Sequence, residues 1–136
     1  MSDHLFAYGT LIPGCEPAHM RGTCAGMEIV GEGTVRGVLY DLGRFPGVVE
    51  GDGTVRGSVL RVPDGAWPAL DEYEICPGPD CEDGLFRRIR ITATLDNGER
   101  VECWLYVYAR DVRRGTIVRS GDWRASRGGP ATIPPP

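Results

Sequence analysis

FRRIRITATLDNGERVECWLYVYA, residues 86–109, is the stretch that decides the fold. In its first ten residues, isoleucine and alanine alternate with arginine and threonine, a pattern typical of a strand with one buried face. Asp96-Asn97-Gly98 follows, and Asn-Gly favours a tight turn because both residues tolerate positive φ angles. A second apolar run returns through residues 100–109. The segment therefore predicts an antiparallel β-hairpin.

Further strand signals precede this hairpin. Residues 4–10 form a short apolar run that ends in a glycine turn, and three more runs have strand composition: 26–33, 34–42 and 54–62. The pentapeptide GTVRG occurs at 33–37 and again at 53–57, which suggests two comparable strand entries. The 20 glycines and 11 prolines are about twice the average usage and favour short strands joined by turns.

One helix is expected, over residues 65–74, with Asp64 as its N-cap. Pro68 is tolerated in the first turn, where its missing N–H has no partner to lose. Many strands around one main helix predict an α+β fold, a small mixed domain with a strongly curved or barrel-like sheet. We expect one domain over residues 1–127 and a flexible, proline-rich tail over residues 128–136.

Composition and charge exclude several function classes. All 15 basic residues are arginine, against 19 acidic residues, so the net charge of −4 gives no general attraction to nucleic acid or anionic membranes. The arginine-rich stretch 110–127 is interpreted as a solvated face, with a phosphate or nucleic-acid role as the alternative. No apolar run approaches the roughly 20 residues of a membrane span. Five cysteines without a visible secretory signal favour reduced thiols, no metal site and a cytoplasmic location.

Glu74 stands out at the end of the expected helix. At about 100° per residue it projects between Trp67 and Leu70, inside the apolar face. Burial of a carboxylate is costly unless the group is paired or protonated. Two interpretations stay open. The side chain turns to solvent or binds an arginine such as Arg88, or it is a general base whose pKa is raised by desolvation.

Tyr8-Gly9-Thr10-Leu11 directly follows the first expected strand. A glycine at a strand end lets the backbone approach a ligand closely, and successive N–H groups there can form an anion-binding concavity. The alternative interpretation is a simple turn.

Several motifs occur in a fixed order along residues 4–124: LFAYGTLIPG, VRGVLYDLGRFPGVV, LDEYE, FRR and SGDW. Together they resemble the γ-glutamylcyclotransferase-like family, in particular its small members related to γ-glutamylamine cyclotransferase and the AIG2-like proteins. The resemblance implies a small α/β structure built around a β-barrel with a central cavity. It also implies a cofactor-free reaction. The α-amine of a γ-glutamyl group attacks its own γ-carbonyl, which forms 5-oxoproline and releases an amine or amino acid.

The same resemblance implies roles for individual residues. The loop Tyr8–Leu11 binds the γ-glutamyl part, and Glu74, which ends the L-D-x-[FY]-E motif, is the catalytic base. Arg88 matches a family arginine and is expected to bind substrate, with a structural ion pair as the alternative. Phe86 stands where the family often has tyrosine, and the acidic stretch 75–84 is longer than in the smallest members and could form a lid.

The expected partner is a small γ-glutamyl substrate, without nucleic acid, membrane, metal or cofactor. A non-catalytic small-molecule-binding or interaction protein on the same scaffold is the alternative function.

Overall fold

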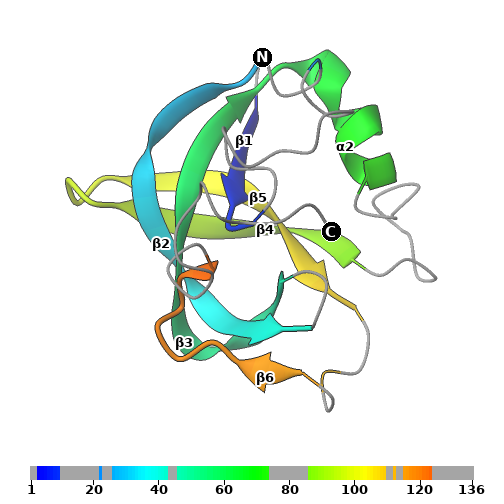
Figure 1. The fold of residues 1–136 in the computed structure, drawn as a ribbon. Helices are drawn as coiled ribbons and strands as arrows, with labels where there is room; N and C mark the ends of the chain where they lie inside the picture. The colour runs from blue at the N-terminus through cyan, green and yellow to red at the C-terminus, as the bar shows by residue number, and fades with distance from the viewer. Residues whose placement is uncertain are drawn as a thin grey trace.

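The computed structural model describes residues 3–9, 22, 26–42, 46–73, 86–109, 112 and 115–123 (Figure 1). Most of this part is strand, and a 3₁₀ turn leads into the α-helix α2. The elements are β1 (Asp3–Ala7), β2 (Glu28–Asp41), β3 (Pro46–Val62), η2 (Asp64–Ala66), α2 (Trp67–Tyr73), β4 (Phe86–Leu95), β5 (Arg100–Tyr108) and β6 (Thr116–Ile117).

Strands β1 to β5 close into a barrel (Figure 1). The sheet order is β1-β3-β5-β4-β2-β6, and additional β1–β5 and β3–β2 pairings complete the ring. Closure depends on a bend in β3. The second half of β3 pairs with β1, whereas its first residues reach β5 at Val48↔Val107. The predicted α+β class with a barrel-like sheet is confirmed, and the central cavity stays a prediction.

The two GTVRG segments pair with each other. Strands β2 and β3 are antiparallel, with the register Gly33↔Gly57, Thr34↔Arg56, Val35↔Val55 and Arg36↔Thr54. Both glycines lie where a third strand approaches. A Cβ on Gly33 would overlap the carbonyl oxygen of Thr94, and one on Gly57 would overlap that of Ala7. The glycines of the repeated motif therefore allow close approach of β4 to β2 at Gly33 and of β1 to β3 at Gly57.

The β4–β5 hairpin forms as the sequence predicts. Its register runs from Phe86↔Tyr108 to Thr94↔Arg100. Gly98 has a φ of 91°, and its N–H donates to the carbonyl of Leu95 at 2.9 Å. The Asn-Gly turn thus adopts the positive φ that its sequence favours.

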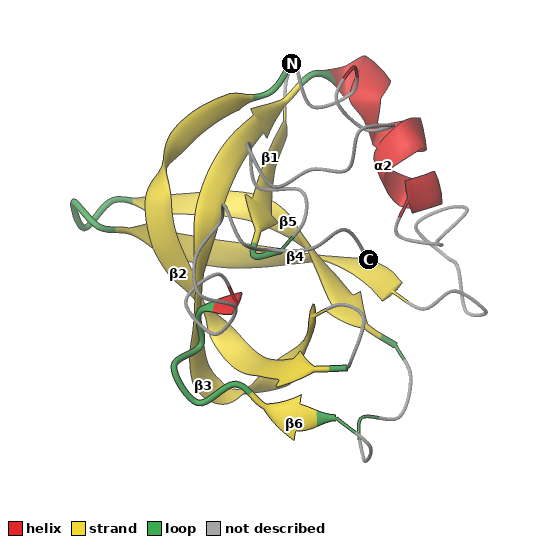
Figure 2. Ribbon diagram, in the orientation of Figure 1, coloured by secondary structure: helices red, strands yellow, loops and turns green. Residues whose placement is uncertain are grey.

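Alternation along the strands produces two apolar cores. One lies inside the barrel and includes Phe6, Val35, Val59 and Leu105. The other lies between the outer face of the barrel and α2 (Figure 2), and its buried members are Leu5, Ala7, Met27, Leu60, Val62, Trp67, Leu70, Phe86 and Tyr106. Because neighbouring residues of one strand point to opposite faces, β1 and β5 contribute to both cores.

Three local predictions need correction. Asp64 is not an N-cap, because it lies inside the 3₁₀ turn, which Pro63 enters in an extended conformation without a side-chain cap. Strand β3 begins at Pro46 rather than near residue 54, because residues 46–49 pair with β2. Strand β2 is continuous over residues 28–41 and not two separate runs.

Some predictions concern residues outside the described part of the chain: the stretch 75–84, residues 110, 111, 113, 114 and 124–127 of the arginine-rich stretch, and the tail 128–136. They stay predictions, as does the domain boundary at residue 127. Among the described residues, no helix has the length and apolar character to cross a membrane.

Candidate active site

The Tyr8 side chain lies in the barrel interior where β1 ends. It is 7% exposed, and its hydroxyl donates to the carbonyl of Tyr106 on β5 at 2.7 Å. The same oxygen accepts from the N–H of Val48 on β3 at 3.4 Å. Strand β1 ends at Ala7, and just beyond it the Tyr8 hydroxyl contacts both neighbouring strands, β3 and β5. This contact fixes the direction in which the chain leaves the sheet.

Gly9 follows Tyr8 and packs closely against the start of β3. A Cβ at Gly9 would lie 2.8 Å from Cγ of Pro46, the first residue of β3, so a larger residue would force one of the two segments to move. Thr10 and Leu11 lie outside the described residues. The predicted anion-binding role of the loop Tyr8–Leu11 therefore stays a prediction, with its first two residues held closely by the barrel.

Helix α2 presents the apolar face that the sequence predicts. Trp67 is 8% exposed and Leu70 is fully buried, and both pack on the outer face of the barrel. Glu74 follows directly after the end of α2 at Tyr73 and lies outside the described residues. Its orientation, its pKa and its catalytic role stay predictions.

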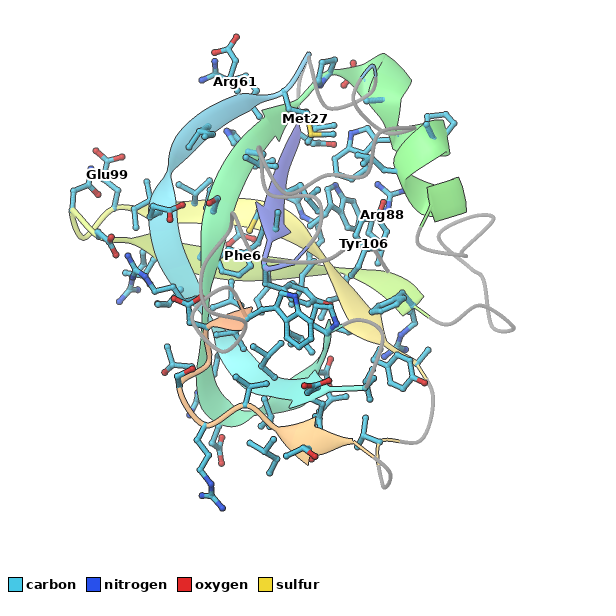
Figure 3. The ribbon with its side chains drawn as sticks, viewed as in Figure 1. Phe6, Met27, Arg61, Arg88, Glu99 and Tyr106 are labelled. Carbon is cyan, nitrogen blue, oxygen red and sulfur yellow. The ribbon has the colours of Figure 1, made fainter. Side chains whose placement is uncertain are left out.

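Arg88 on β4 is held between two tryptophans. Its guanidinium carbon lies 4.6 Å from the ring centroid of Trp67 on α2 and 4.6 Å from that of Trp104 on β5. Arg88 lies between the barrel and α2 (Figure 3). Such cation–π contacts are worth about 0.5–2 kcal/mol each, depending on desolvation. The clamp fixes Arg88 beside the helix that carries the chain to Glu74, and its substrate-binding role stays a prediction.

Sequence reasoning missed this clamp. Arg90 also lies over Trp104, at 4.9 Å, and is its direct cross-strand partner. The hairpin pattern alone could have placed Arg88, Arg90 and Trp104 on one face, because residues two apart on paired strands share a face. Phe86, the departure from the family pattern, packs edge-on against Tyr108 with centroids 5.5 Å apart.

A second missed feature is a polar pair on the outer face of the barrel. Ser58 on β3 is 1% exposed, and its hydroxyl donates to the carboxylate of Glu32 on β2. Ser58 is the one buried polar residue in the part that the structure describes, aromatic residues set apart. No sequence signal marked it, because a lone serine in a strand is common.

The described residues include potential metal ligands and one cysteine thiol, Cys103. Within them, no group of three His, Cys, Asp or Glu side chains could hold a metal ion. Cys103 is a free thiol inside the barrel, and burial raises its pKa to about 11. A buried thiol with a raised pKa is a poor nucleophile.

Comparison with known proteins supports one assignment. The family model described as "Gamma-glutamyl cyclotransferase, AIG2-like" matches residues 5–125. The Escherichia coli (strain K12) protein named "Gamma-glutamylcyclotransferase family protein YtfP" is 30% identical over 123 residues, which cover 88% of this chain and 94% of that protein.

Solved structures share the fold. YkqA from Bacillus subtilis superimposes with a TM-score of 0.71 at 21% identity, over 93% of this chain and 41% of that chain. A mouse AIG2-like protein gives a TM-score of 0.66 at 21% identity, over 83% of this chain and 81% of that chain. The chain thus spans less than half of YkqA and most of the mouse protein.

Proposed function

The chain belongs to the γ-glutamyl cyclotransferase, AIG2-like family, and from this premise we propose that it is a cyclotransferase that releases 5-oxoproline from a small γ-glutamyl compound. The observation that carries the proposal is the family match over residues 5–125, a span that includes the loop Tyr8–Leu11, Glu74 and Arg88. The released group is an amine or an amino acid.

The chemistry makes few demands on the protein. The α-amine of the substrate forms a bond to the carbon of its own γ-carbonyl, and the bond from that carbonyl carbon to the leaving nitrogen breaks. A tethered amine that closes a five-membered ring reacts at a high effective concentration. The protein has to accept the ammonium proton, stabilise the developing oxyanion and hold the chain bent.

We assign these tasks to the residues around the end of β1 and the end of α2. Glu74 takes the proton from the ammonium and passes it to the leaving nitrogen. The backbone N–H groups of residues 9–11 bind either the substrate carboxylate or the oxyanion. The burial of Trp67 and Leu70 supports this assignment, because it anchors the helix that leads to Glu74.

Arg88 is assigned to substrate binding. A guanidinium stacks through its faces and donates hydrogen bonds in its plane, so stacking on Trp67 and Trp104 is compatible with binding a carboxylate. The rigid clamp also lowers the side-chain entropy that Arg88 would lose on binding.

The test is product formation. The protein is incubated with a panel of γ-glutamyl amines and γ-glutamyl amino acids, and 5-oxoproline is measured by mass spectrometry. We expect Glu74→Gln to lower the rate by about 10²-fold or more, the usual scale for a general base. Glu72→Gln is the matched control, because the helical wheel places Glu72 on the opposite side.

Two outcomes would contradict the proposal. Absence of 5-oxoproline from every compound would leave a non-catalytic binding protein on this scaffold. Equal turnover by wild type and Glu74→Gln would remove Glu74 from the mechanism.

A further inference from the structure

Trp104 on β5 contacts two arginines of β4. The guanidinium carbon of Arg88 lies 4.6 Å from a Trp104 ring centroid, and that of Arg90 lies 4.9 Å from it. The two guanidinium carbons can therefore be no further apart than the sum of these distances. Residues two apart on a strand share a face, so both side chains leave the same face of β4. Arg90 is thus a direct neighbour of the arginine that we assign to substrate binding.

The two arginines differ in their exposure. Arg88 is half-buried and also contacts Trp67 on α2, whereas Arg90 is exposed. An exposed guanidinium reaches a ligand without any movement of the core. It can stack one face on an indole and still donate hydrogen bonds in its plane. Arg90 can therefore bind a second anion beside the one that Arg88 is assigned to bind.

Two acidic residues near Arg90 have other partners. Glu102, a diagonal neighbour of Arg90 across the hairpin, accepts a hydrogen bond from the Thr92 hydroxyl at 2.6 Å. Asp3 accepts one from the indole N–H of Trp104 at 3.5 Å. Within the part of the chain that the structure describes, Arg90 forms no hydrogen bond or ion pair. Among these residues, its positive charge is met by the Trp104 ring and by no carboxylate.

We propose that Arg90 binds a carboxylate on the released part of the substrate, so that the preferred substrates are γ-glutamyl amino acids rather than γ-glutamyl amines. The inference rests on the proposed function, which supplies the substrate and assigns Arg88 to it. A γ-glutamyl amino acid carries one carboxylate on its γ-glutamyl part and another on the part that is released. A simple γ-glutamyl amine carries the first alone. Arg88 and Arg90 provide one guanidinium for each of the two carboxylates.

The spacing of the two guanidiniums agrees with this substrate class. Seven covalent bonds separate the two carboxylate carbons of a γ-glutamyl α-amino acid, which gives an extended reach of roughly 9 Å. The common contact with Trp104 limits the separation of the Arg88 and Arg90 guanidinium carbons to a distance of this size. One substrate molecule can therefore contact both arginines at once.

The test compares two compounds that differ by the carboxylate alone, γ-L-glutamylglycine and γ-L-glutamylmethylamide. Both are given together, at equal concentration, to the full chain, and the released glycine and methylamine are measured by mass spectrometry. In such a mixture the ratio of the initial rates is the ratio of the two kcat/KM values. We expect wild type to favour γ-L-glutamylglycine by about tenfold or more, the scale of a hydrogen bond between charged groups. Arg90→Gln should bring the ratio close to unity.

Two further variants make the test specific. Arg100→Gln is the matched control, because Arg100 is an exposed arginine at the start of β5 and its loss changes the net charge equally. It should keep the wild-type ratio. Arg90→Lys keeps the charge and should keep part of the preference. Because both compounds compete in one mixture, a variant that is partly unfolded loses rate without changing the ratio.

The outcomes separate this inference from the proposed function. If wild type forms 5-oxoproline from both compounds at equal rates, the inference is overturned and the proposed function stands. The same holds if Arg90→Gln keeps the wild-type ratio, which would also be the result if Arg90 bound the α-carboxylate that both compounds share. If wild type forms no 5-oxoproline from any γ-glutamyl compound, the proposed function fails, and the inferred substrate class fails with it.

Discussion

Replacement of Tyr8 by phenylalanine removes a single oxygen from the barrel interior. That oxygen donates to the Tyr106 carbonyl at 2.7 Å and accepts from the Val48 N–H at 3.4 Å. The ring stays in place, so no large cavity forms. Loss of a buried hydrogen bond that leaves a partner behind costs about 1–3 kcal/mol, and the longer contact adds little. We expect a loss of about 2 kcal/mol in the free energy of unfolding.

The assay is urea unfolding followed by tryptophan fluorescence. With an unfolding entropy of about 2.1 cal/mol/K per residue over 136 residues, the expected loss corresponds to a fall in Tm of roughly 7 °C. The urea midpoint should fall at constant slope, because the exposed surface is unchanged.

Tyr40→Phe is the control for Tyr8→Phe. Tyr40 is half-buried on β2, and its hydroxyl makes no hydrogen bond within the described part of the chain. If Tyr8→Phe were no more destabilising than Tyr40→Phe, the Tyr8 hydroxyl would not join β3 to β5.

Three further predictions concern the barrel. Gly57→Ala should cost at least about 2 kcal/mol in urea unfolding, because the new Cβ would overlap the Ala7 carbonyl and lie 2.9 Å from the Phe6 ring; Gly65→Ala, with nothing within 4 Å, should be nearly neutral. Cys103 should resist iodoacetamide at pH 8 in the folded protein, because burial raises its pKa to about 11. It should react once urea unfolds the chain, and mass spectrometry would detect the added group. Rapid labelling of the native state would contradict this prediction. The hydrogen bond from Arg56 lowers the pKa of Asp96 below its ordinary value of 3.8, so the folded state binds this proton less readily than the unfolded state. The stabilisation by the Arg56–Asp96 pair is then present above pH 3.8 and is lost as the pH falls through the lowered pKa of Asp96. Asp96→Asn should therefore flatten the acid side of the curve of Tm against pH. An unchanged curve would show that this ion pair does not contribute to the acid dependence of stability.

Local chemistry made the β4–β5 hairpin predictable. The alternation of residues 86–95 and the Asn97-Gly98 turn act over a few residues and need no distant partner. The start of β3 was not predictable in this way, because residues 46–53 are rich in glycine and acidic residues and resemble a turn. Pairing with β2 makes residues 46–49 a strand, and such context overrides intrinsic preference.

In the candidate site, too, features set by local sequence were predictable and features set by tertiary packing were not. Helical spacing placed Trp67 and Leu70 on the buried face, and both are buried. The Arg88 clamp was missed, because it needs one indole from α2 and another from β5, and their meeting depends on tertiary packing. The inward hydroxyl of Tyr8 was missed for a similar reason, since its backbone partners are 98 and 40 residues away.

One measurement tests the cyclisation most directly. The wild-type protein converts a γ-glutamyl compound in H₂¹⁸O, and the products are analysed by mass spectrometry against a protein-free control. If the substrate's own amine attacks the γ-carbonyl carbon, the product is 5-oxoproline without ¹⁸O, because no water enters the reaction. Glutamate that carries ¹⁸O in its side-chain carboxylate would show attack by water and would contradict a cyclotransferase.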